Sequence, residues 1–527
     1  MASRRDELNA YTFARKRMVG AFLQPSGGGN DEDAPRPVRA VLPSFVVAAV
    51  LVAGFGMWGV LKPSAPPGWD SGKAILQGKT STTRYVMLKD EKGVGYLHQV
   101  LNMSSARLVL QADAPVQIVA DDVLDKYPHH GATIGIPYAP DRLPKPDDAG
   151  KAKLWSVCDK LGEGNTQANV SQSVFIAADD EAKTLTQADR LVGDGQSLFV
   201  QGPQEAGHPG SVYLVDGQGR KHAVGRLDTS ERERAALETA LFKQDSKPQQ
   251  VTKEWLDTLA DGEPIGFPDI PDFKSTQVVK SSVDLSQDAE EKVGRLLKFQ
   301  DSYYVVGLNK LFQITPFQAE LIRLDPAEAV AYNQAVPVYA EMSPADNNRL
   351  QSKIEKSMMD VDKKLPQVAS PAVNIGDKAR TVICSTFNGY DDHGNIKRSV
   401  WAHTEYPAQV NPGASTAHVT AGHGLLFRAM EGDTLTPDAA ASSGSDFLIT
   451  DAGLRYSLPA NADGGNGQTA SQAPADPQGG DKKSANESQA RLGYKSVTAV
   501  QVSKKWTDLV PAGPVLNTNT AVQAQNA

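Results

Sequence analysis

Cysteine is nearly absent from this sequence: Cys158 and Cys384 are the only two among 527 residues. With no CxxC pair and no Cys/His spacing, the sequence excludes a zinc finger, a zinc ribbon and a thioredoxin-like redox motif. Two interpretations of the cysteines remain open. They pair with each other, as is usual outside the cytoplasm, or they are two separate buried thiols.

An excess of basic charge is also missing. The chain holds 54 Lys and Arg against 62 Asp and Glu, so its formal net charge is −8. Because nucleic-acid binding relies on Lys and Arg to neutralise phosphates, this balance argues against a nucleic-acid partner.

Histidine is scarce, and its two clusters are His129-His130 and the pair His418 and His423. Neither cluster has the spacing of metal ligands with carboxylate support. We therefore expect surface histidines, no bound metal and no cofactor.

No active-site signature is recognisable. The stretch GKAILQGKT places five residues between Gly72 and Gly78. A P-loop needs four, and it follows a strand rather than the Pro-rich linker found here. We expect no catalytic residue, and we keep nucleotide hydrolysis dependent on Lys73 or Lys79 as an alternative.

One long run lacks charge altogether. Residues 40–61 lie between Arg39 and Lys62 and match the ~20 apolar residues that cross a membrane as a helix. The run is too long, and too far from the first residue, for a cleaved signal peptide. Lys and Arg are concentrated before it, so the positive-inside rule predicts a cytoplasmic N-terminus and a large C-terminal region outside the plasma membrane.

Two features near this span suggest contacts. Ala49, Ala53 and Gly56 fall on one helical face, where another membrane helix could pack closely; a lipid-facing anchor is the alternative. Before the span, DELNAYTFARKRMVGAFLQP predicts a helix with an apolar stripe. Its cluster of Arg15, Lys16 and Arg17 suits anionic lipids or an acidic partner.

A twelve-residue segment occurs twice. VTKEWLDTLADG (251–262) and VSKKWTDLVPAG (502–513) share five positions, among them the Trp255/Trp506 and Gly262/Gly513 pairs. A third, weaker copy lies at 119–131. We expect a short helix ended by a left-handed glycine cap. Each tryptophan has an apolar partner four residues later, which favours packing on its own hairpin; binding to cell-wall sugar is the alternative.

A β-hairpin pattern precedes each copy, because apolar strands flank a glycine-containing turn. The pattern recurs at 85–100, 212–224, 303–314 and 447–458. The unit is therefore a hairpin plus a helix, and the helix of the third unit, within 316–365, has diverged.

These patterns predict an α+β chain: a single transmembrane helix, then four hairpin/helix repeat domains around a central, mostly β domain. The predicted divisions are a cytoplasmic segment 1–39, the span 40–61, a linker 62–79, repeat 1 at 80–140, a first central segment at 151–192, repeat 2 at 195–272, repeat 3 at 297–365, a second central segment at 372–435, repeat 4 at 445–517 with a disordered insertion at 460–489, and a loose tail at 518–527.

Taken together, these features resemble the EccB family of type VII (ESX-type) secretion systems. The resemblance rests on SRRDELNAYTFARKRMVGAF, the single span, the repeated units, the two cysteines and the closing DLVPAGPVL at 508–516. It implies four repeat domains around a central domain held by a disulfide, which matches Cys158 and Cys384.

The resemblance also implies a function. EccB-like proteins assemble with an EccC-type ATPase and with EccD and EccE subunits into an oligomeric inner-membrane complex that exports WXG100/Esx-type substrates. The expected role is therefore structural, with contacts to membrane lipids and to other copies of the chain. Two alternatives stay open: an ATPase, as such families have been labelled, and a module that binds cell-wall peptidoglycan.

Overall fold

The computed structural model describes residues 4–23, 37–61, 65–162, 166–193, 195–204, 209–243, 245–287, 290–356, 365, 371–410, 416–435, 444–459 and 487–525. The chain divides into two units. One comprises residues 1–69, 77–82 and 117–128, and the other comprises residues 70–76, 83–116 and 129–527.

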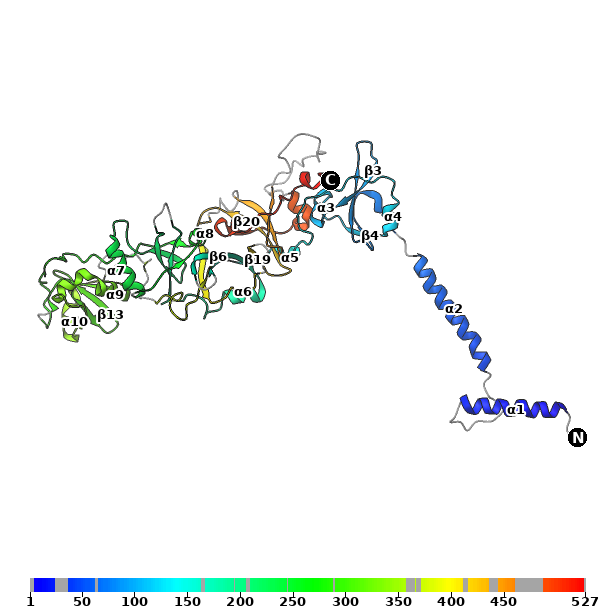
Figure 1. Ribbon diagram of the computed structural model, residues 1–527, viewed down its shortest axis with the longest axis horizontal. Coiled ribbons are helices and arrows are strands. Elements are labelled where there is room, and N and C mark those ends of the chain that lie inside the picture. Colours follow the sequence, from blue (N-terminus) through cyan, green and yellow to red (C-terminus); the bar gives the residue numbers. More distant parts are fainter. Residues whose placement is uncertain are drawn as a thin grey trace. The chain divides into compact units, whose positions relative to one another are not determined.

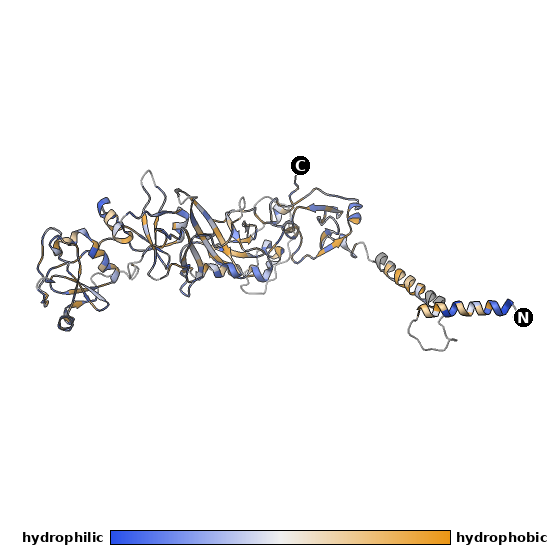
Figure 2. Cartoon of the chain, turned by 60° about the horizontal axis from the view of Figure 1, so that its bottom comes forward, coloured by the Kyte–Doolittle hydropathy of each residue, from blue (hydrophilic) through white to orange (hydrophobic). Residues whose placement is uncertain are grey.

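The first unit begins with two helices, α1 (Arg4–Leu23) and α2 (Pro37–Leu61). Helix α1 is exposed along almost its whole length, including Arg15, Lys16 and Arg17, and it is most hydrophilic towards its N-terminal end (Figure 2).

Helix α2 contains the predicted span, and its side chains are described for residues 43–55. Ala49 and Ala53 are exposed there, whereas the surroundings of Gly56 lie outside the described residues. Within the residues that are described, no helix combines the length and the apolar character that crossing a membrane requires.

Most of the chain forms four small sheets, which we call sheets 1 to 4, and a central sheet (Figure 1). Sheet 1 follows the short helix η1 (Trp69–Ser71) and has the order β3-β2-β1-β4. Its elements are β1 (Ile75–Gly78), β2 (Arg84–Lys89), β3 (Gly95–Val100), α3 (Met103–Val109), β4 (Val116–Val119) and α4 (Asp121–Asp125).

Sheet 2 has the order β10-β7-β8-β9-β11, and sheet 3 has the order β15-β12-β13-β14-β16. The elements of sheet 2 are β7 (Ser197–Gln201), β8 (Val212–Asp216), β9 (Arg220–Ala223), α7 (Glu231–Phe242), β10 (Gln249–Gln250), α8 (Lys253–Thr258) and β11 (Ala260–Asp261). Those of sheet 3 are β12 (Leu296–Phe299), β13 (Ser302–Val306), β14 (Leu311–Ile314), α9 (Pro316–Leu324), η4 (Pro326–Tyr332), β15 (Tyr339–Glu341), α10 (Pro344–Leu350), η5 (Gln351–Lys353) and β16 (Ile354–Glu355).

Sheet 4 has the order β22-β21-β20-β23. Its elements are β20 (Gly424–Met430), β21 (Ser445–Thr450), β22 (Arg455–Leu458), α12 (Glu487–Gln489), η6 (Ala490–Tyr494), β23 (Val500–Ser503) and α13 (Lys504–Thr507). Residues 460–486 of the predicted insertion lie outside the described residues. Its last three residues, 487–489, form helix α12, so they are not part of a disordered insertion.

Sheets 2, 3 and 4 are built in the same way. Three consecutive strands form an antiparallel meander, and a fourth strand, reached through a helix, pairs parallel with the first. After a second short helix, the chain pairs parallel with the third strand. Sheet 1 shares this order of elements, with a parallel bridge between Leu97 and His130.

The hairpin turns have a local cause. In the turns after β2 and β8, an aspartate carboxylate (Asp90 or Asp216) accepts two backbone N–H bonds across the turn. A glycine three residues later, Gly93 or Gly219, has φ of 81° or 75°, which favours glycine. The four hairpins predicted from glycine spacing are therefore present.

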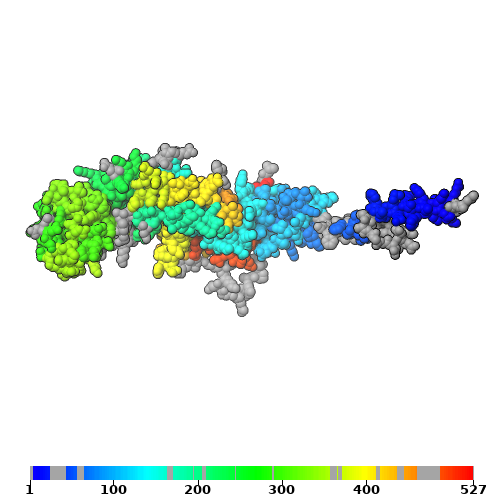
Figure 3. Space-filling view, turned by 90° about the horizontal axis from the view of Figure 1, so that it is seen from below, coloured from blue at the N-terminus to red at the C-terminus, as the bar shows by residue number. Residues whose placement is uncertain are grey.

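The central sheet combines strands from two distant regions of the chain. Its order is β18-β17-β5-β6-β19, with β5 (Leu154–Gly162), β6 (Thr166–Ala177), β17 (Val382–Tyr390), β18 (Ile396–His403) and β19 (Ala417–Val419). Strands β5 and β17 are antiparallel neighbours. In Figure 3 the teal β5–β6 region and the yellow β17–β18 region accordingly lie side by side. The helices α5 (Pro146–Ala149) and α6 (Asp179–Leu185) flank β5 and β6 in the sequence.

Two predicted divisions need correction. Residues 372–435 were assigned to the central domain, yet β20 pairs with β21 and β23 and so belongs to sheet 4. Residues 518–527 were expected to be a loose tail. Instead, the described residues 518–525 contain helix α14 (Thr518–Ala521), whose Ala521 enters an apolar core, and Ala524 bridges Ile134.

Candidate functional site

The Cys158–Cys384 disulfide lies in the middle of the central sheet. The two residues face each other on β5 and β17, with their Cα atoms 4.0 Å apart and their sulfur atoms bonded. Both side chains are fully buried. The pairing expected from the sequence is confirmed, and it joins two strands that are 226 residues apart.

Both repeated tryptophans pack against this central sheet. Trp255 on α8 and Trp506 on α13 are 0% exposed, and one apolar core contains both of them with Trp155 and Ile383 of the central sheet. The prediction of core packing is confirmed, but the partners extend beyond each tryptophan's own hairpin. Because neither ring reaches the surface, sugar stacking on them is excluded in this structure.

Arg398 of β18 connects the two tryptophan helices. Its Nε donates to the carbonyl of Thr258 at the end of α8 (2.9 Å), and its guanidinium lies 5.8 Å from the centre of the Trp506 ring. Phe387 of β17 also contacts the Trp506 ring. One arginine therefore ties sheet 2 to the tryptophan of sheet 4 across the central sheet.

A buried hydrogen-bond network fixes α8 on β5. Thr252, the N-cap residue, donates from its amide (2.7 Å) and its hydroxyl (2.9 Å) to the Asp159 carboxylate. Its hydroxyl oxygen accepts from the Trp255 amide and from Gln172 Nε2 (3.1 and 2.5 Å). Capping and sheet attachment therefore use the same side chain.

The equivalent position beside the other cysteine is uncharged. Ser385 follows Cys384 as Asp159 follows Cys158, and the Ser385 carbonyl accepts from Trp506 Nε1 (3.2 Å). The hydroxyls of Ser385 and Ser503 have no hydrogen-bond partner among the described residues. Strand β5 therefore holds helix α8 through a carboxylate, whereas β17 holds helix α13 through a backbone carbonyl.

The charged network has a consequence for pH. Burial raises the pKa of Asp159 to about 6, although hydrogen bonds from Thr252 and Gln172 favour the carboxylate. The folded state therefore keeps this proton between about pH 4 and 6, where the unfolded chain has lost it. The contribution of Asp159 to the free energy of unfolding should fall by about 3 kcal/mol as the pH rises through that window, and it should stay constant above it.

Asp159→Asn is expected to remove this fall, which urea unfolding between pH 4.5 and 7.5 would measure. Asp148→Asn is a control of opposite sign. Burial raises the pKa of Asp148, but bonds from Lys153, His423 and the Gly424 amide outweigh burial and leave it lowered. That carboxylate stabilises the fold above its unfolded pKa, so its contribution is lost as the pH falls. The same pH slope in wild type and Asp159→Asn would contradict the assignment.

The repeated glycines are not helix caps, and that prediction is wrong. Gly131, Gly262 and Gly513 lack positive φ angles. Each lies against an aromatic ring of the third strand, where an added Cβ would come within 2.1 Å of His98, 2.4 Å of His222 or 2.5 Å of Tyr456. Glycine is required because the backbone packs directly on the ring.

Gly262→Ala should therefore lower the free energy of unfolding by about 1–3 kcal/mol, since the new methyl group overlaps a buried imidazole. Gly193→Ala is the matched control, because no atom lies within 4 Å of its added Cβ. Urea unfolding of both variants measures the difference; equal stabilities would contradict the packing explanation.

The GKT segment does not form a phosphate loop. The amides of Thr80 and Ser81, which a P-loop would offer to phosphate, donate to the Asp121 carboxylate (2.8 and 3.1 Å). Hydrogen bonds from Ser81 and the Thr80 amide lower the pKa of Asp121 to about 2, so this carboxylate stays charged. The Asp121 carboxylate therefore already occupies the amides that a phosphate would need.

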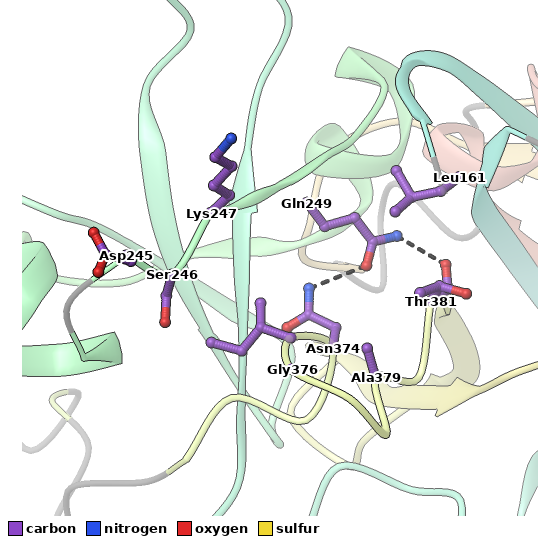
Figure 4. Close-up of a pocket in the computed structure, with 10 residues that line it drawn as sticks. Leu161, Asp245, Ser246, Lys247, Gln249, Asn374, Gly376, Ala379 and Thr381 are labelled. Carbon is purple, nitrogen blue, oxygen red and sulfur yellow. Dashed lines mark hydrogen bonds between the residues drawn. The ribbon is translucent and has the colours of Figure 1, made fainter. Parts of the chain in front are cut away.

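A cavity of about 360 Å³ lies between sheet 2 and the segment before β17 (Figure 4). Two of its polar lining residues, Gln249 and Asn374, are hydrogen-bonded to each other and to neighbouring segments. Asn374 Nδ2 donates to Gln249 Oε1 (3.1 Å), and Gln249 Nε2 donates to the Thr381 carbonyl (2.9 Å). Asn374 also exchanges two bonds with the backbone of Phe199. The side-chain amides of Asn374 and Gln249 therefore join β7, β10 and the segment before β17, which is a structural role.

The two predicted histidine clusters differ in exposure. His129 and His130 are exposed, as expected, but His418 and His423 are half-buried. His418 lies 3.0 Å from Glu181, and His423 lies between Asp148 and Asp179 (2.8 and 3.2 Å). Among the described residues, no group of three such side chains is arranged to hold a metal ion.

Sequence reasoning missed the polar residues that secure the tryptophan helices: Asp159, Gln172, Thr252, Ser385 and Arg398. One signal was available for Thr252, since threonine before KEW is a typical N-cap. Asp159 is a charged residue beside a buried cysteine in an apolar run, which marks it as unusual but does not reveal its partner.

Comparison with known proteins gives a match over the whole sequence. Residues 1–527 match the family described as "Type VII secretion system ESX-1, transport TM domain B". The "ESX-1 secretion system ATPase EccB1" of Mycobacterium tuberculosis is 25% identical over 328 residues, which span 62% of each chain. The "ESX-3 secretion system ATPase EccB3" of Mycolicibacterium smegmatis is 23% identical over 439 residues, covering 80% of this chain and 75% of that relative.

Two solved structures share the fold. A chain of an intact ESX-5 inner membrane complex gives a TM-score of 0.56 at 18% identity, covering 100% of this chain and 96% of that one. A chain from "Structure of EccB3 dimer from the ESX-3 core complex" gives 0.56 at 21% identity, covering 86% and 100%. The mixed α+β architecture is therefore that of these proteins.

Proposed function

Because the chain belongs to the EccB family of type VII secretion systems, we propose that it is a structural component of an inner-membrane core complex that exports WXG100/Esx-type substrates. The match over residues 1–527 carries this proposal. The relatives it matches include a protein solved within an ESX-5 inner membrane complex.

The proposed arrangement has four repeats around the central sheet. Sheets 1 to 4 are the cores of the repeats, and their shared order of elements supports a common origin. The disulfide, Asp159 and Arg398 then serve to hold the repeats in fixed places, as a scaffold requires.

The proposed topology follows the sequence. Residues 40–61 would cross the plasma membrane once, with 1–39 in the cytoplasm and the sheets outside. Ala49, Ala53 and Gly56 would pack on another membrane helix. The exposed Arg15, Lys16 and Arg17 would face lipid headgroups or a partner.

The proposed partners are an EccC-type ATPase, EccD and EccE subunits and a second copy of the chain. The EccB3 relative was solved as a dimer, which supports self-association. The relatives' names also carry the word ATPase. Since Asp121 takes the amides of the GKT segment, we assign the motor activity to the separate EccC-type subunit.

Deleting residues 1–24 tests the proposal. The expected result is loss of the complex on native gels of detergent-solubilised membranes, while Cys158 and Cys384 remain paired and the sheets remain folded. Arg15→Glu/Lys16→Glu/Arg17→Glu should weaken assembly, and Arg15→Lys/Arg17→Lys is the charge-preserving control. An intact complex on the native gel after the deletion would overturn the assembly role assigned to residues 1–24.

A further inference from the structure

The segment that follows sheet 4 runs across to the neighbourhood of α3. Near its start, the Leu516 amide donates to the Ser457 carbonyl of sheet 4 (2.9 Å). Asn517 then caps helix α14, whose Ala521 is fully buried in one core with Leu108 of α3. We call residues 514–525 the strap.

The end of the strap pairs with residues 133–135. Ala524 bridges Ile134 in antiparallel register. The Gln525 amide donates to the Thr133 carbonyl (2.8 Å), its side chain donates to the Gly135 carbonyl (2.7 Å), and the Gly135 amide donates to the Gln523 carbonyl (3.4 Å). The strap therefore covers a short edge that would otherwise offer unpaired backbone groups.

A comparable segment follows sheet 2. Residues 263–285 leave β11 and pack on sheet 3, where Ile270 and Val279 join the core of β12–β14. The large apolar side chains that this segment buries are Ile265, Phe267, Ile270, Val283 and Leu285. The strap buries only Leu516 and Ala521.

The difference in burial decides which segment opens. Apolar burial contributes about 1.5–3 kcal/mol for each large side chain, so the strap is held by far less than residues 263–285. Val515 and Val522 remain substantially exposed, and α14 is only four residues long. Segments with few buried apolar contacts open locally at low free energy.

We propose that the strap is a releasable latch: it opens as a local unit while both sheets stay folded, and its release uncovers the edge at 133–135 and the apolar side of α3. The contact between α3 and the η6 segment of sheet 4 remains closed during release. Arg107 donates to the Leu492 carbonyl (3.0 Å) and Arg491 donates to the Leu108 and Leu110 carbonyls (2.9 and 3.0 Å), independently of the strap.

Hydrogen–deuterium exchange of the full chain in detergent tests this. Peptides covering 515–525 and 133–136 should exchange at least about tenfold faster than peptides from 265–285. Gln525→Pro removes one backbone donor and the side-chain donor. It should raise exchange at 133–136 further and leave 265–285 unchanged.

An engineered disulfide that holds the strap closed provides the opposite test, because it should slow exchange. Ile134 and Ala524 are a non-hydrogen-bonded antiparallel pair, the geometry that suits a disulfide. Oxidised Ile134→Cys/Ala524→Cys should slow exchange at both sites to the level of 265–285, whereas Ile134→Cys alone should not. Equal protection of the two segments in the wild type, or an unchanged pattern in the locked chain, would overturn the proposal.

Discussion

Replacing Cys158 and Cys384 together by alanine is expected to lower the free energy of unfolding by about 5 kcal/mol, because the bond closes a loop of 226 residues in the denatured chain. The loop contains sheets 2 and 3 entirely, so the bond restrains nearly half of the chain. Both cysteines are buried in the folded state. Each alanine removes only one sulfur atom there, so the cavities left behind are small. Urea unfolding of wild type and the double variant measures the effect.

Single variants provide the control for this experiment. Cys158→Ala and Cys384→Ala each break the same bond, so each should lose about as much stability as the double variant. A loss below about 1 kcal/mol in all three variants would show that the native strands hold together without the covalent link.

Trp255→Ala and Trp506→Ala should each cost about 3–5 kcal/mol, since each removes a fully buried indole from the core that joins the central sheet to sheets 2 and 4. Substitution by phenylalanine distinguishes the two tryptophans, because within the described part of the chain only one of them uses its indole N–H in a hydrogen bond. Trp506→Phe also loses the bond from Nε1 to the Ser385 carbonyl, worth about 1 kcal/mol. Trp255 Nε1 has no partner among the described residues, so Trp255→Phe loses only packing.

The same variants address cell-wall binding. Because both rings are buried, folded Trp255→Phe and Trp506→Phe should bind insoluble peptidoglycan to the same extent as the wild type does. A selective loss of binding in a variant with normal unfolding behaviour would contradict the structural role of these rings.

The hairpins could be predicted because their information is local. Alternation and an Asp-to-Gly turn, as at Asp216 and Gly219, identify two strands whatever surrounds them. The strand before each hairpin was missed. LLKF at 296–299 and GLLFRAM at 424–430 are short, mainly apolar runs, and such a run does not indicate which sheet its strand joins.

The functional contacts were less predictable because they are long-range. Thr252 meets Asp159 across 93 residues, and Arg398 meets Thr258 across 140. The glycine error has the same origin. Gly262 ends a helical pattern in the sequence, yet the ring of His222, forty residues earlier in the chain, explains why it must be glycine.

The composition of the central sheet has a consequence for the order of folding. Sheets 1, 2 and 3 each close from contiguous sequence, but β5 and β6 must wait for β17 and β18, more than two hundred residues later. During synthesis from the N-terminal end, β5 therefore emerges long before β17 and exposes the edge that β17 later covers. Correct assembly depends on sheets 2 and 3 folding as independent units in that interval, before the two halves of the sheet meet.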